Sequence, residues 1–442
     1  MKLPVYQKYK PSGVEWLGDV PVHWEKMRLK FACTGIRTGG TPSPEYMDNA
    51  DEKTVAWFTP ADFRESLELN ESSRKITSEA ITAAEAPLFP AGTVFVVGIG
   101  TLGKVGFCNQ PASANQQVNA LLPHPGTDSR FLALLLSIYD EHMRALANSA
   151  TLPILNQQRM GDIAIVLPPL LEQRSIADFL ERETARLEAL MKTKERLLEL
   201  LAEKRSVLVT RAVTCGLDSD APVCDSGLHW LGKISAHWRI ERARWLFKER
   251  DERSETGEEE MLTVSHITGV TPRSEKDVNM FEAETTEGYK LCYRGDLVIN
   301  TLWAWMGAMG VSPITGIVSP AYHVYTPSQE LLGDYVDALV RTPNFAREVT
   351  RYSKGVWSSR LRLYPEGFFE VFLPVPPLPE QRAIVAHIAT ETAKLDALRE
   401  ATKRTIGLLK ERRAALIAAA VTGRIAIPEN TEDNLPGGRH EN

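Results

Sequence analysis

Two stretches of this 442-residue chain repeat each other and decide its fold. Residues 168–214 begin PPLLEQRSI and end AVT, and residues 376–422 begin PPLPEQRAI and end AVT. They align without a gap at an offset of 208, with roughly 22 identities over their 47 positions. Internal repetition of this kind indicates an architecture built from repeated units. The chain is therefore predicted to consist of two related halves.

Each copy of this repeat is predicted to form one long helix. Both follow a proline pair and carry an acid in the first turn, Glu172 or Glu380, where the helix dipole favours it. Apolar residues then recur at steps of three and four, as in a coiled-coil seam. This seam consists of Ile176, Leu180, Leu187, Leu190, Leu197, Leu201 and Leu208, and of Ile384, Ile388, Leu395, Leu398, Leu409 and Leu416. An isolated helix cannot bury such a stripe. We therefore expect the two helices to form an antiparallel coiled coil within the chain, with packing of each helix on its own block as the alternative.

A second repeated motif, at an offset of 214, opens each half. Residues 12–24 read SGVEWLGDVPVHW, and residues 226–238 read SGLHWLGKISAHW. Two tryptophans and a histidine recur in register, so the duplication extends beyond the helices. Because His23 and His237 lie inside this motif, we interpret them as packed structural side chains rather than catalytic ones.

The blocks between these motifs have diverged far more than the helices. Both contain β-branched and aromatic runs punctuated by Gly and Pro, which is typical of strands and turns. Strands are predicted at residues 94–97, 106–107, 297–299 and 322–325, and helices at residues 129–147 and 331–350. We therefore predict an α+β chain with an internal pseudo-two-fold repeat. Its parts are globular domains at residues 1–166 and 217–374, long helices at residues 167–216 and 375–425, and a flexible tail at residues 426–442.

The composition excludes several classes of protein. The chain is 43% hydrophobic and 24% charged with a net charge of −6, which suits globular domains rather than a disordered or collagen-like chain. No run approaches the ~18 apolar residues of a membrane span, and the first 30 residues contain no signal-peptide core, so we expect a cytoplasmic protein. The five cysteines show no C-x-x-C spacing, so we expect reduced structural thiols and no zinc site.

Signatures of catalysis are weak. Residues 98–103 read GIGTLG and fit the G-x-G-x-x-G fingerprint, but the residues that follow read as a strand instead of the required helix. A Gly-rich hairpin is therefore preferred to a cofactor loop. The sequence contains no Walker A, H-E-x-x-H or G-x-S-x-G motif. We predict no catalytic residue, metal ligand or cofactor on this chain.

Side chains suited to contacting DNA gather in a few segments of the two blocks. Arg and Lys commonly bind phosphates, and Asn and Gln can bind adenine through two hydrogen bonds. The candidates are Thr38, Gly39, Thr41, Lys104, Asn115, Gln116, Gln117, Asn156, Gln157 and Arg159 in the first block, and Arg351, Lys354, Trp357, Ser358, Arg360 and Arg362 in the second. Ordinary turns and a solvated helix face are the alternative interpretations.

The repeated motifs resemble those of the specificity (S) subunits of type I restriction-modification systems. S-G-x-x-W-L-G, P-P-L-x-E-Q-R and the A-V-T helix ends are similar to that family's conserved regions, and the likeness covers essentially the whole chain. The loop at residues 38–43 and the pair Asn115-Gln116 also look like one group of the family's target-recognition domains.

This resemblance implies a non-catalytic DNA-recognition subunit. Each block would be a target-recognition domain that reads one half of a split double-stranded DNA target. The paired helices would be a spacer and a docking platform for methyltransferase (M) subunits, which would bind S-adenosylmethionine and methylate adenine at N6. Restriction (R) subunits would add cleavage driven by ATP and Mg. The alternative is a coiled-coil scaffold protein that does not bind DNA directly.

Overall fold

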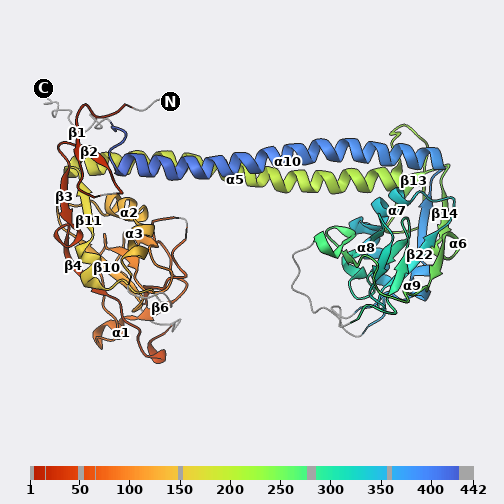
Figure 1. Cartoon of the computed structure of the whole chain (residues 1–442), viewed down its shortest axis with the longest axis horizontal. Coiled ribbons are helices and arrows are strands. Elements are labelled where there is room, and N and C mark those ends of the chain that lie inside the picture. Colours follow the sequence, from red (N-terminus) through yellow and green to blue (C-terminus); the bar gives the residue numbers. More distant parts are fainter. Residues whose placement is uncertain are drawn as a thin grey trace, which may run out of the picture. The chain divides into compact units, whose positions relative to one another are not determined.

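The computed structural model describes residues 4–14, 16–47, 54–64, 66–147, 153–275, 285–355 and 361–427. The chain divides into two compact units: unit 1 comprises residues 1–192 and 406–442, and unit 2 comprises residues 193–405. Each unit contains strands and helices (Figure 1), so the chain is a mixed α+β protein. Each of the two long helices contributes one part to each unit.

Unit 1 is built around a four-stranded antiparallel sheet with the order β4-β10-β7-β8. These strands are β4 (Cys33–Thr38), β7 (Val94–Val97), β8 (Val105–Phe107) and β10 (Val118–Pro123). Smaller sheets pair β1 (Tyr9–Pro11) with β2 (Asp19–Pro21), β3 (Glu25–Arg28) with β11 (Ala164–Leu167), and β5 (Thr54–Phe58) with β6 (Lys75–Thr77) and β9 (Ser113–Ala114). The short helices are η1 (Leu29–Phe31), η2 (Pro44–Tyr46), α1 (Ser78–Thr82), α2 (Ser129–Ser137), α3 (Asp140–Ala145) and α4 (Gln157–Asp162).

Unit 2 contains a four-stranded sheet with the same chain order, first, fourth, second and third. Its strands are β15 (Phe247–Arg250), β19 (Leu297–Ile299), β20 (Met309–Val311) and β22 (His323–Pro327). Smaller pairs are β12 (Val223–Asp225) with β13 (Lys233–Ser235), β14 (Arg239–Arg242) with β23 (Phe372–Val375), β16 (Leu262–Ser265) with β17 (Gly269–Pro272), and β18 (Lys290–Cys292) with β21 (Gly316–Val318). The short helices are α6 (Ala243–Leu246), η3 (Arg273–Glu275), η4 (Ala304–Met306), α7 (Gly333–Val340), α8 (Pro343–Arg351) and α9 (Pro365–Phe369).

The predicted strands are confirmed as β7, β8, β19 and β22, but both predicted single helices are wrong in detail. Residues 129–147 form α2 and α3, and residues 331–350 form parts of α7 and α8. In unit 2 the break follows from local chemistry. The Thr342 hydroxyl accepts a hydrogen bond from the Phe345 amide, and Pro343 occupies the first helical turn. Proline starts a helix well but cannot continue one, so a new helix begins at this point.

The repeated segments form the long helices α5 (Leu170–Cys215) and α10 (Leu378–Val421). In unit 1 the first part of α5 lies beside the last part of α10 (Figure 1), where Glu188 pairs with Arg413 at 2.9 Å. In unit 2 the last part of α5 lies beside the first part of α10, where Arg205 lies 3.7 Å from Asp396. Each unit therefore contains its own contacts between the two helices.

The predicted apolar seam needs one correction. Leu187 and Leu409 are buried, as expected, and they cluster with Met191. Leu190 and Leu398, which were assigned to the seam, are 42% and 47% exposed. An α-helix completes a turn in 3.6 residues, and here the four-residue step from Leu187 to Met191 stays on the packed face while the three-residue step to Leu190 leaves it.

Both long helices end at a glycine with left-handed backbone geometry. Gly216 has φ of 83°, and Gly423 has φ of 71°. A Cβ on Gly423 would lie 2.3 Å from the Pro21 side chain, and one on Gly216 would lie 3.2 Å from Trp238. Glycine is therefore required both by the turn and by close packing against the tryptophan motif. Among the described residues, no helix is long and apolar enough to cross a membrane.

Candidate nucleic-acid interface

The duplicated histidines contact the duplicated glutamates at the start of the long helices. In unit 1, Nε2 of His23 lies 2.7 Å from the Glu172 carboxylate, and in unit 2, Nε2 of His237 lies 2.8 Å from the Glu380 carboxylate. The histidine side chains are 44% and 52% exposed, so they are not packed inside a core as the sequence suggested. Each histidine instead connects the tryptophan motif to the first turn of a long helix.

The glutamine that follows each glutamate connects the globular block to the same helix. Gln173 is buried, accepts a hydrogen bond from the Asp128 amide and donates to the Pro168 carbonyl. Gln381 is also buried, accepts from the Leu332 amide and donates to a carbonyl in the same way. Sequence reasoning missed this role, although the repeated E-Q pair was its signal. The motif therefore positions the blocks on the long helices.

Polar residues from three separate segments of unit 1 line one hollow of about 380 Å³. The hollow lies where β4 ends, before β10 begins and where α4 starts. Five of the predicted site residues belong to its lining, namely Thr38, Gln116, Gln117, Asn156 and Gln157. The fold thus brings together side chains that are more than a hundred residues apart in the chain, which sequence reasoning had placed only in separate loops.

Some of these side chains are fixed by hydrogen bonds within the hollow, and others are exposed and available to contact a ligand. Asn119 is buried, receives a hydrogen bond from the Thr38 hydroxyl at 3.0 Å and donates to the Leu155 carbonyl at 3.0 Å. The Gln157 amide group lies 2.8 Å from the same hydroxyl. Gln116 and Gln158 are exposed. Asn119 was not predicted, because an amide inside a strand gives no sequence signal of a binding surface.

Several predicted residues have local structural roles. Asn115 accepts a hydrogen bond from the Gln117 amide, and Asn156 caps α4 by accepting from the Arg159 amide. The Arg159 guanidinium donates to the Leu146 carbonyl at 2.8 Å. Lys104 is exposed, and its ammonium reaches the Phe63 carbonyl at 3.2 Å. These contacts orient the side chains; Asn115 is buried, whereas Lys104 and Asn156 are exposed.

Gly39 and Thr41 of the first block also lie outside this lining. Glycine is required at position 39, because a Cβ there would lie 2.1 Å from the Ala114 carbonyl oxygen. Thr41 is exposed but does not line the hollow.

The GIGTLG segment connects two strands, as the hairpin interpretation required. Val96 of β7 pairs with Val105 of β8, and the strands are antiparallel. This connection separates the first hollow from a second one of about 560 Å³, and both hollows are lined in part by Ile99 and Gln117. The second hollow also contains Arg74, a cation that sequence reasoning did not select. Because they share these residues, the two hollows form one surface on unit 1, called the recognition surface below.

In unit 2 the structure brings two of the predicted cations together. Lys354 and Arg362 exchange two backbone hydrogen bonds of 2.9 Å, and both side chains are exposed. Arg351 ends α8, and its side chain is 66% exposed beside Glu348 at 3.2 Å. The remaining predicted residues of this block, Trp357, Ser358 and Arg360, lie outside the described residues.

The β19–β20 connection of unit 2 carries exposed apolar side chains that sequence reasoning missed. It occupies the same place between the second and third strands of the sheet as GIGTLG does in unit 1. Leu302 is 40% exposed and Trp303 is 50% exposed. Its sequence signal was the run T-L-W-A-W-M-G, which places two tryptophans in a short turn.

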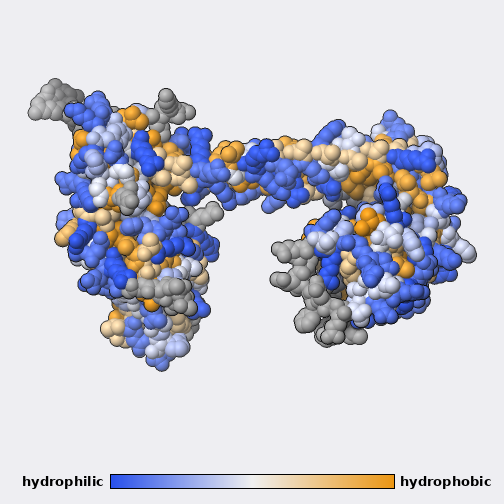
Figure 2. Space-filling model, viewed as in Figure 1, coloured by the Kyte–Doolittle hydropathy of each residue, from blue (hydrophilic) through white to orange (hydrophobic). Residues whose placement is uncertain are grey.

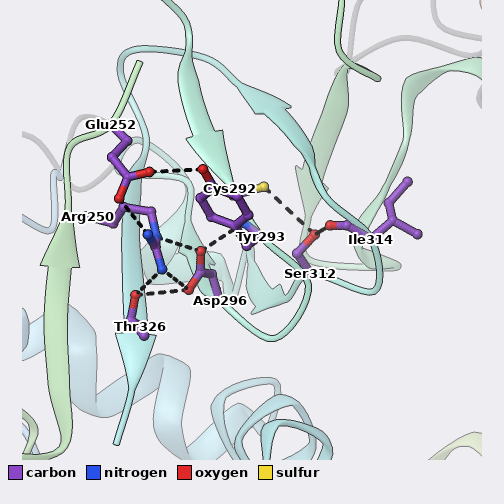
Figure 3. A network of polar contacts seen from close by, with 8 residues as sticks. All are labelled: Arg250, Glu252, Cys292, Tyr293, Asp296, Ser312, Ile314 and Thr326. Atoms are coloured by element: carbon purple, nitrogen blue, oxygen red, sulfur yellow. Dashed lines mark hydrogen bonds and ion pairs between the residues drawn. The ribbon is translucent and has the colours of Figure 1, made fainter. Parts of the chain in front are cut away.

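A polar network in unit 2 is structural (Figure 3). The Arg250 guanidinium binds the Asp296 carboxylate at 2.9 Å, Glu252 at 2.7 Å and the Thr326 hydroxyl at 2.8 Å, while its plane lies over the Tyr293 ring. The Tyr293 hydroxyl and Arg250 both hydrogen-bond Glu252 and lower the pKa of that carboxyl. Because these contacts occupy the guanidinium from several sides, Arg250 joins strands and is not presented to a ligand.

Two other potentially reactive groups, the thiols of Cys108 and Cys292, are buried. Burial raises the pKa of the Cys108 thiol and of the Cys292 thiol to about 11, so both are protonated at neutral pH and are poor nucleophiles. In the described part of the chain, no cluster of three or more His, Cys, Asp or Glu side chains could hold a metal ion.

Known proteins are similar to this chain in sequence and in fold. Residues 21–200 match the family described as "Type I restriction modification DNA specificity domain". The MjaIX specificity subunit of Methanocaldococcus jannaschii is 25% identical over 168 residues, which are 37% of this chain and 38% of that protein. The EcoR124I/EcoR124II specificity subunit of Escherichia coli is 25% identical over 33% of this chain and 37% of that protein. The EcoBI specificity subunit of Escherichia coli is 20% identical over 74% of this chain and 72% of that protein.

Two solved structures have a similar fold. The HsdS subunit from Thermoanaerobacter tengcongensis superimposes with a TM-score of 0.55 and 16% identity, over 92% of this chain and 98% of that one. A chain from a study of the assembly and conformational transition of the type I R-M system gives a TM-score of 0.62 at 16% identity, over 91% and 98% of the two chains. The family match, the related specificity subunits and the duplicated motifs agree. Together they support a specificity subunit of a type I restriction-modification system, a family whose model matches residues 21–200 of this chain.

Proposed function

We propose that this chain reads a two-part DNA target for a type I restriction-modification complex. Each unit recognises one half of the target, and the chain directs methyltransferase subunits to methylate adenine at N6. The single observation that carries this proposal is the convergence of Thr38, Gln116 and Gln157 on one recognition surface. Restriction subunits complete the assembly, and the chain itself binds no cofactor.

The chemistry of the recognition surface suits base readout. Exposed glutamines offer a donor and an acceptor on one group, which can bind adenine through two hydrogen bonds in the major groove. Arg74 and Lys104 supply cations near these amides for phosphates. In unit 2 the exposed cations Lys354 and Arg362 serve the second half-site. The two units differ in these residues because each reads different bases.

The long helices are proposed to be an antiparallel coiled coil that serves as spacer and docking platform. Two pairs of leucines at equivalent positions of the repeat are exposed, Leu190 with Leu398 and Leu200 with Leu408. The space-filling view also shows hydrophobic residues at the surface of these helices (Figure 2). Exposed leucines repeated in this way support docking of two copies of one partner, which we take to be the methyltransferase subunit.

The acidic net charge of −6 fits a subunit that binds DNA within a complex. Phosphate contacts supply most of the affinity of DNA-binding proteins, and partner subunits can provide that basic surface. The test is retention on DNA cellulose of the chain alone, of its methyltransferase alone, and of both together. We expect strong retention only of the mixture. Equal retention of the methyltransferase with and without this chain would favour the scaffold alternative.

A further inference from the structure

Each unit exposes one large aromatic side chain at an equivalent position of the repeat. Phe31 in η1 is 65% exposed, and Trp245 in α6 is 72% exposed. They are separated by 214 residues, which is the offset of the tryptophan motif. Their neighbours Leu29 and Ala243, also 214 residues apart, are fully buried. In both units, therefore, the same short turn directs one side chain into the core and one aromatic side chain into solvent.

The surroundings of these aromatic residues are also duplicated. In unit 1, Asp162 accepts ion pairs from Arg28 at 3.2 Å and from Lys30 at 2.9 Å. In unit 2, Glu370 accepts ion pairs from Arg242 at 2.9 Å and from Arg244. Asp162 and Glu370 are separated by 208 residues, the offset of the long helices. Two cations from the turn thus share one carboxylate in each unit, and an aromatic side chain follows the second cation.

The backbone underneath is equivalent as well. The Leu29 amide donates to the Ile163 carbonyl at 2.8 Å, and the Ala243 amide donates to the Val371 carbonyl at 2.8 Å. We call Arg28, Lys30, Phe31 and Asp162 patch 1, and Arg242, Arg244, Trp245 and Glu370 patch 2. The polar surfaces assigned to DNA differ between the units, whereas these patches are alike. A surface that both units keep serves something common to both halves.

The chemistry of the patches fits a protein better than a DNA duplex. The cations are already engaged with a carboxylate, and the Lys30 ammonium lies 5.6 Å from the centre of the Phe31 ring. The most exposed groups are the aromatic rings, and the DNA backbone offers no apolar surface to bury them. Aromatic residues and arginine are the side chains that contribute most at protein interfaces. Each patch also keeps a net charge of +1, since two cations share one carboxylate, and this charge is complementary to an acidic rim on a partner.

We propose that patches 1 and 2 are equivalent docking points for two copies of the methyltransferase subunit, one on each unit. Phe31 and Trp245 insert into an apolar pocket on that subunit, and carboxylates around the pocket face the cations of the patch. This inference rests on the proposed function, because it takes the methyltransferase as the partner present twice. It adds to the long helices a contact on each globular block.

The test uses the full chain co-expressed with a type I methyltransferase subunit from the same organism. The variants are Phe31→Ala, Trp245→Ala and the double substitution, and the readouts are the mass of the complex and the affinity for the methyltransferase. Ile267→Ala and Val5→Ala are matched controls, because Ile267 is 72% exposed and Val5 is 65% exposed outside the patches. We expect each single variant to weaken one of two binding sites by about 30-fold or more, and the double variant to weaken both, as for interface anchors. The controls should bind two copies like the unmodified chain.

A second pair of variants distinguishes a loss of binding from a loss of folding. Phe31→Glu and Trp245→Glu should weaken binding further than alanine, because they place a carboxylate against an acidic rim, while circular dichroism stays unchanged. A double alanine variant that binds two methyltransferase copies with unchanged affinity would overturn the inference. So would a double variant that loses only retention on DNA, or one that changes only self-association of this chain. The proposed function fails differently, through an unmodified complex that assembles but shows no sequence preference.

Discussion

Glu172 receives more contacts than its counterpart in the second half of the chain. It accepts hydrogen bonds from the Tyr6 hydroxyl at 2.5 Å and the Trp24 indole at 3.1 Å, and it contacts His23. Burial and the Glu172 carboxylate together raise the pKa of Tyr6. In unit 2, Glu380 contacts His237, but the buried Trp238 indole nitrogen has no partner among the described residues. The hydrogen-bonding groups of this motif therefore have more partners in unit 1 than in unit 2.

This asymmetry predicts unequal costs for the same substitution. Glu172→Ala leaves buried hydrogen-bond donors without their acceptor. We therefore expect the free energy of unfolding of unit 1 to fall by about 2–3 kcal/mol. Glu380→Ala should cost about 1 kcal/mol in unit 2, because its partner is a half-exposed histidine. Urea unfolding followed by tryptophan fluorescence measures both, with the exposed Glu199→Ala as control. Equal costs for the two substitutions would contradict this account.

Asp62 predicts a pH dependence of stability in unit 1. Burial raises the pKa of this carboxyl, but hydrogen bonds from Ser73 and Thr59 outweigh burial and lower it. A carboxyl whose pKa is lower in the folded state stabilises the fold above its unfolded pKa of about 4, and this stabilisation is lost as the pH falls through the folded pKa. Asp62→Asn should lower the free energy of unfolding by about 1–3 kcal/mol at neutral pH. It should also reduce the fall in this free energy at acidic pH, which urea unfolding at a series of pH values measures. An unchanged fall at acidic pH would show that Asp62 does not contribute.

The recognition surface predicts a change in half of the target only. Gln116→Ala or Gln157→Ala should relax base preference in the half-site read by unit 1, by about 5- to 150-fold for each lost two-bond contact. The other half-site should keep its sequence. Gln110→Ala is the control, because Gln110 is exposed but does not line either hollow. Relative methylation rates of oligonucleotides altered at single positions measure the effect, and a uniform loss at all sequences would indicate a phosphate contact instead.

At the scale of elements, the long helices predict the spacing of the target. Four residues added to α5 and four added to α10 lengthen a helix pair by roughly 6 Å, which is close to two base pairs. The addition nearly restores the helical phase, since 3.6 residues complete a turn. We expect a longer gap between unchanged half-sites, visible in the methylated motif. An unaltered gap would refute the spacer role.

The sequence predicted elements well where the signal is local. The strands at 94–97 and 297–299 follow from short apolar runs, and the GIGTLG hairpin follows from glycine between two such runs. The seam was less predictable. A three-residue step from Leu187 leads to the exposed Leu190, whereas a four-residue step leads to the packed face. Which of the two steps is buried depends on the partner helix. The break before α8 was readable from Thr342 and Pro343, but the apolar pattern on both sides concealed it.

At the scale of the whole molecule, the duplication was fully visible in the sequence, while the recognition surface was visible only in part. The lining of the hollow joins β4, the segment before β10 and the start of α4, and such long-range pairing leaves no trace in local patterns. Asn119 and Arg74 were missed for this reason, whereas Gln116 and Gln157 were found because amides clustered in loops. The duplicated patches escaped notice because a single exposed aromatic residue is common on protein surfaces.

The central claim is that this chain selects a two-part DNA target. The most direct test is genome-wide mapping of N6-methyladenine in a host without other methylation, expressing this chain with a type I methyltransferase subunit from the same organism. The account predicts one methylated motif with two specific parts around a gap of unspecified bases, and its loss when this chain is omitted. Methylation of the same motif without this chain would contradict the claim. So would no methylation by a methyltransferase that is active with another specificity subunit.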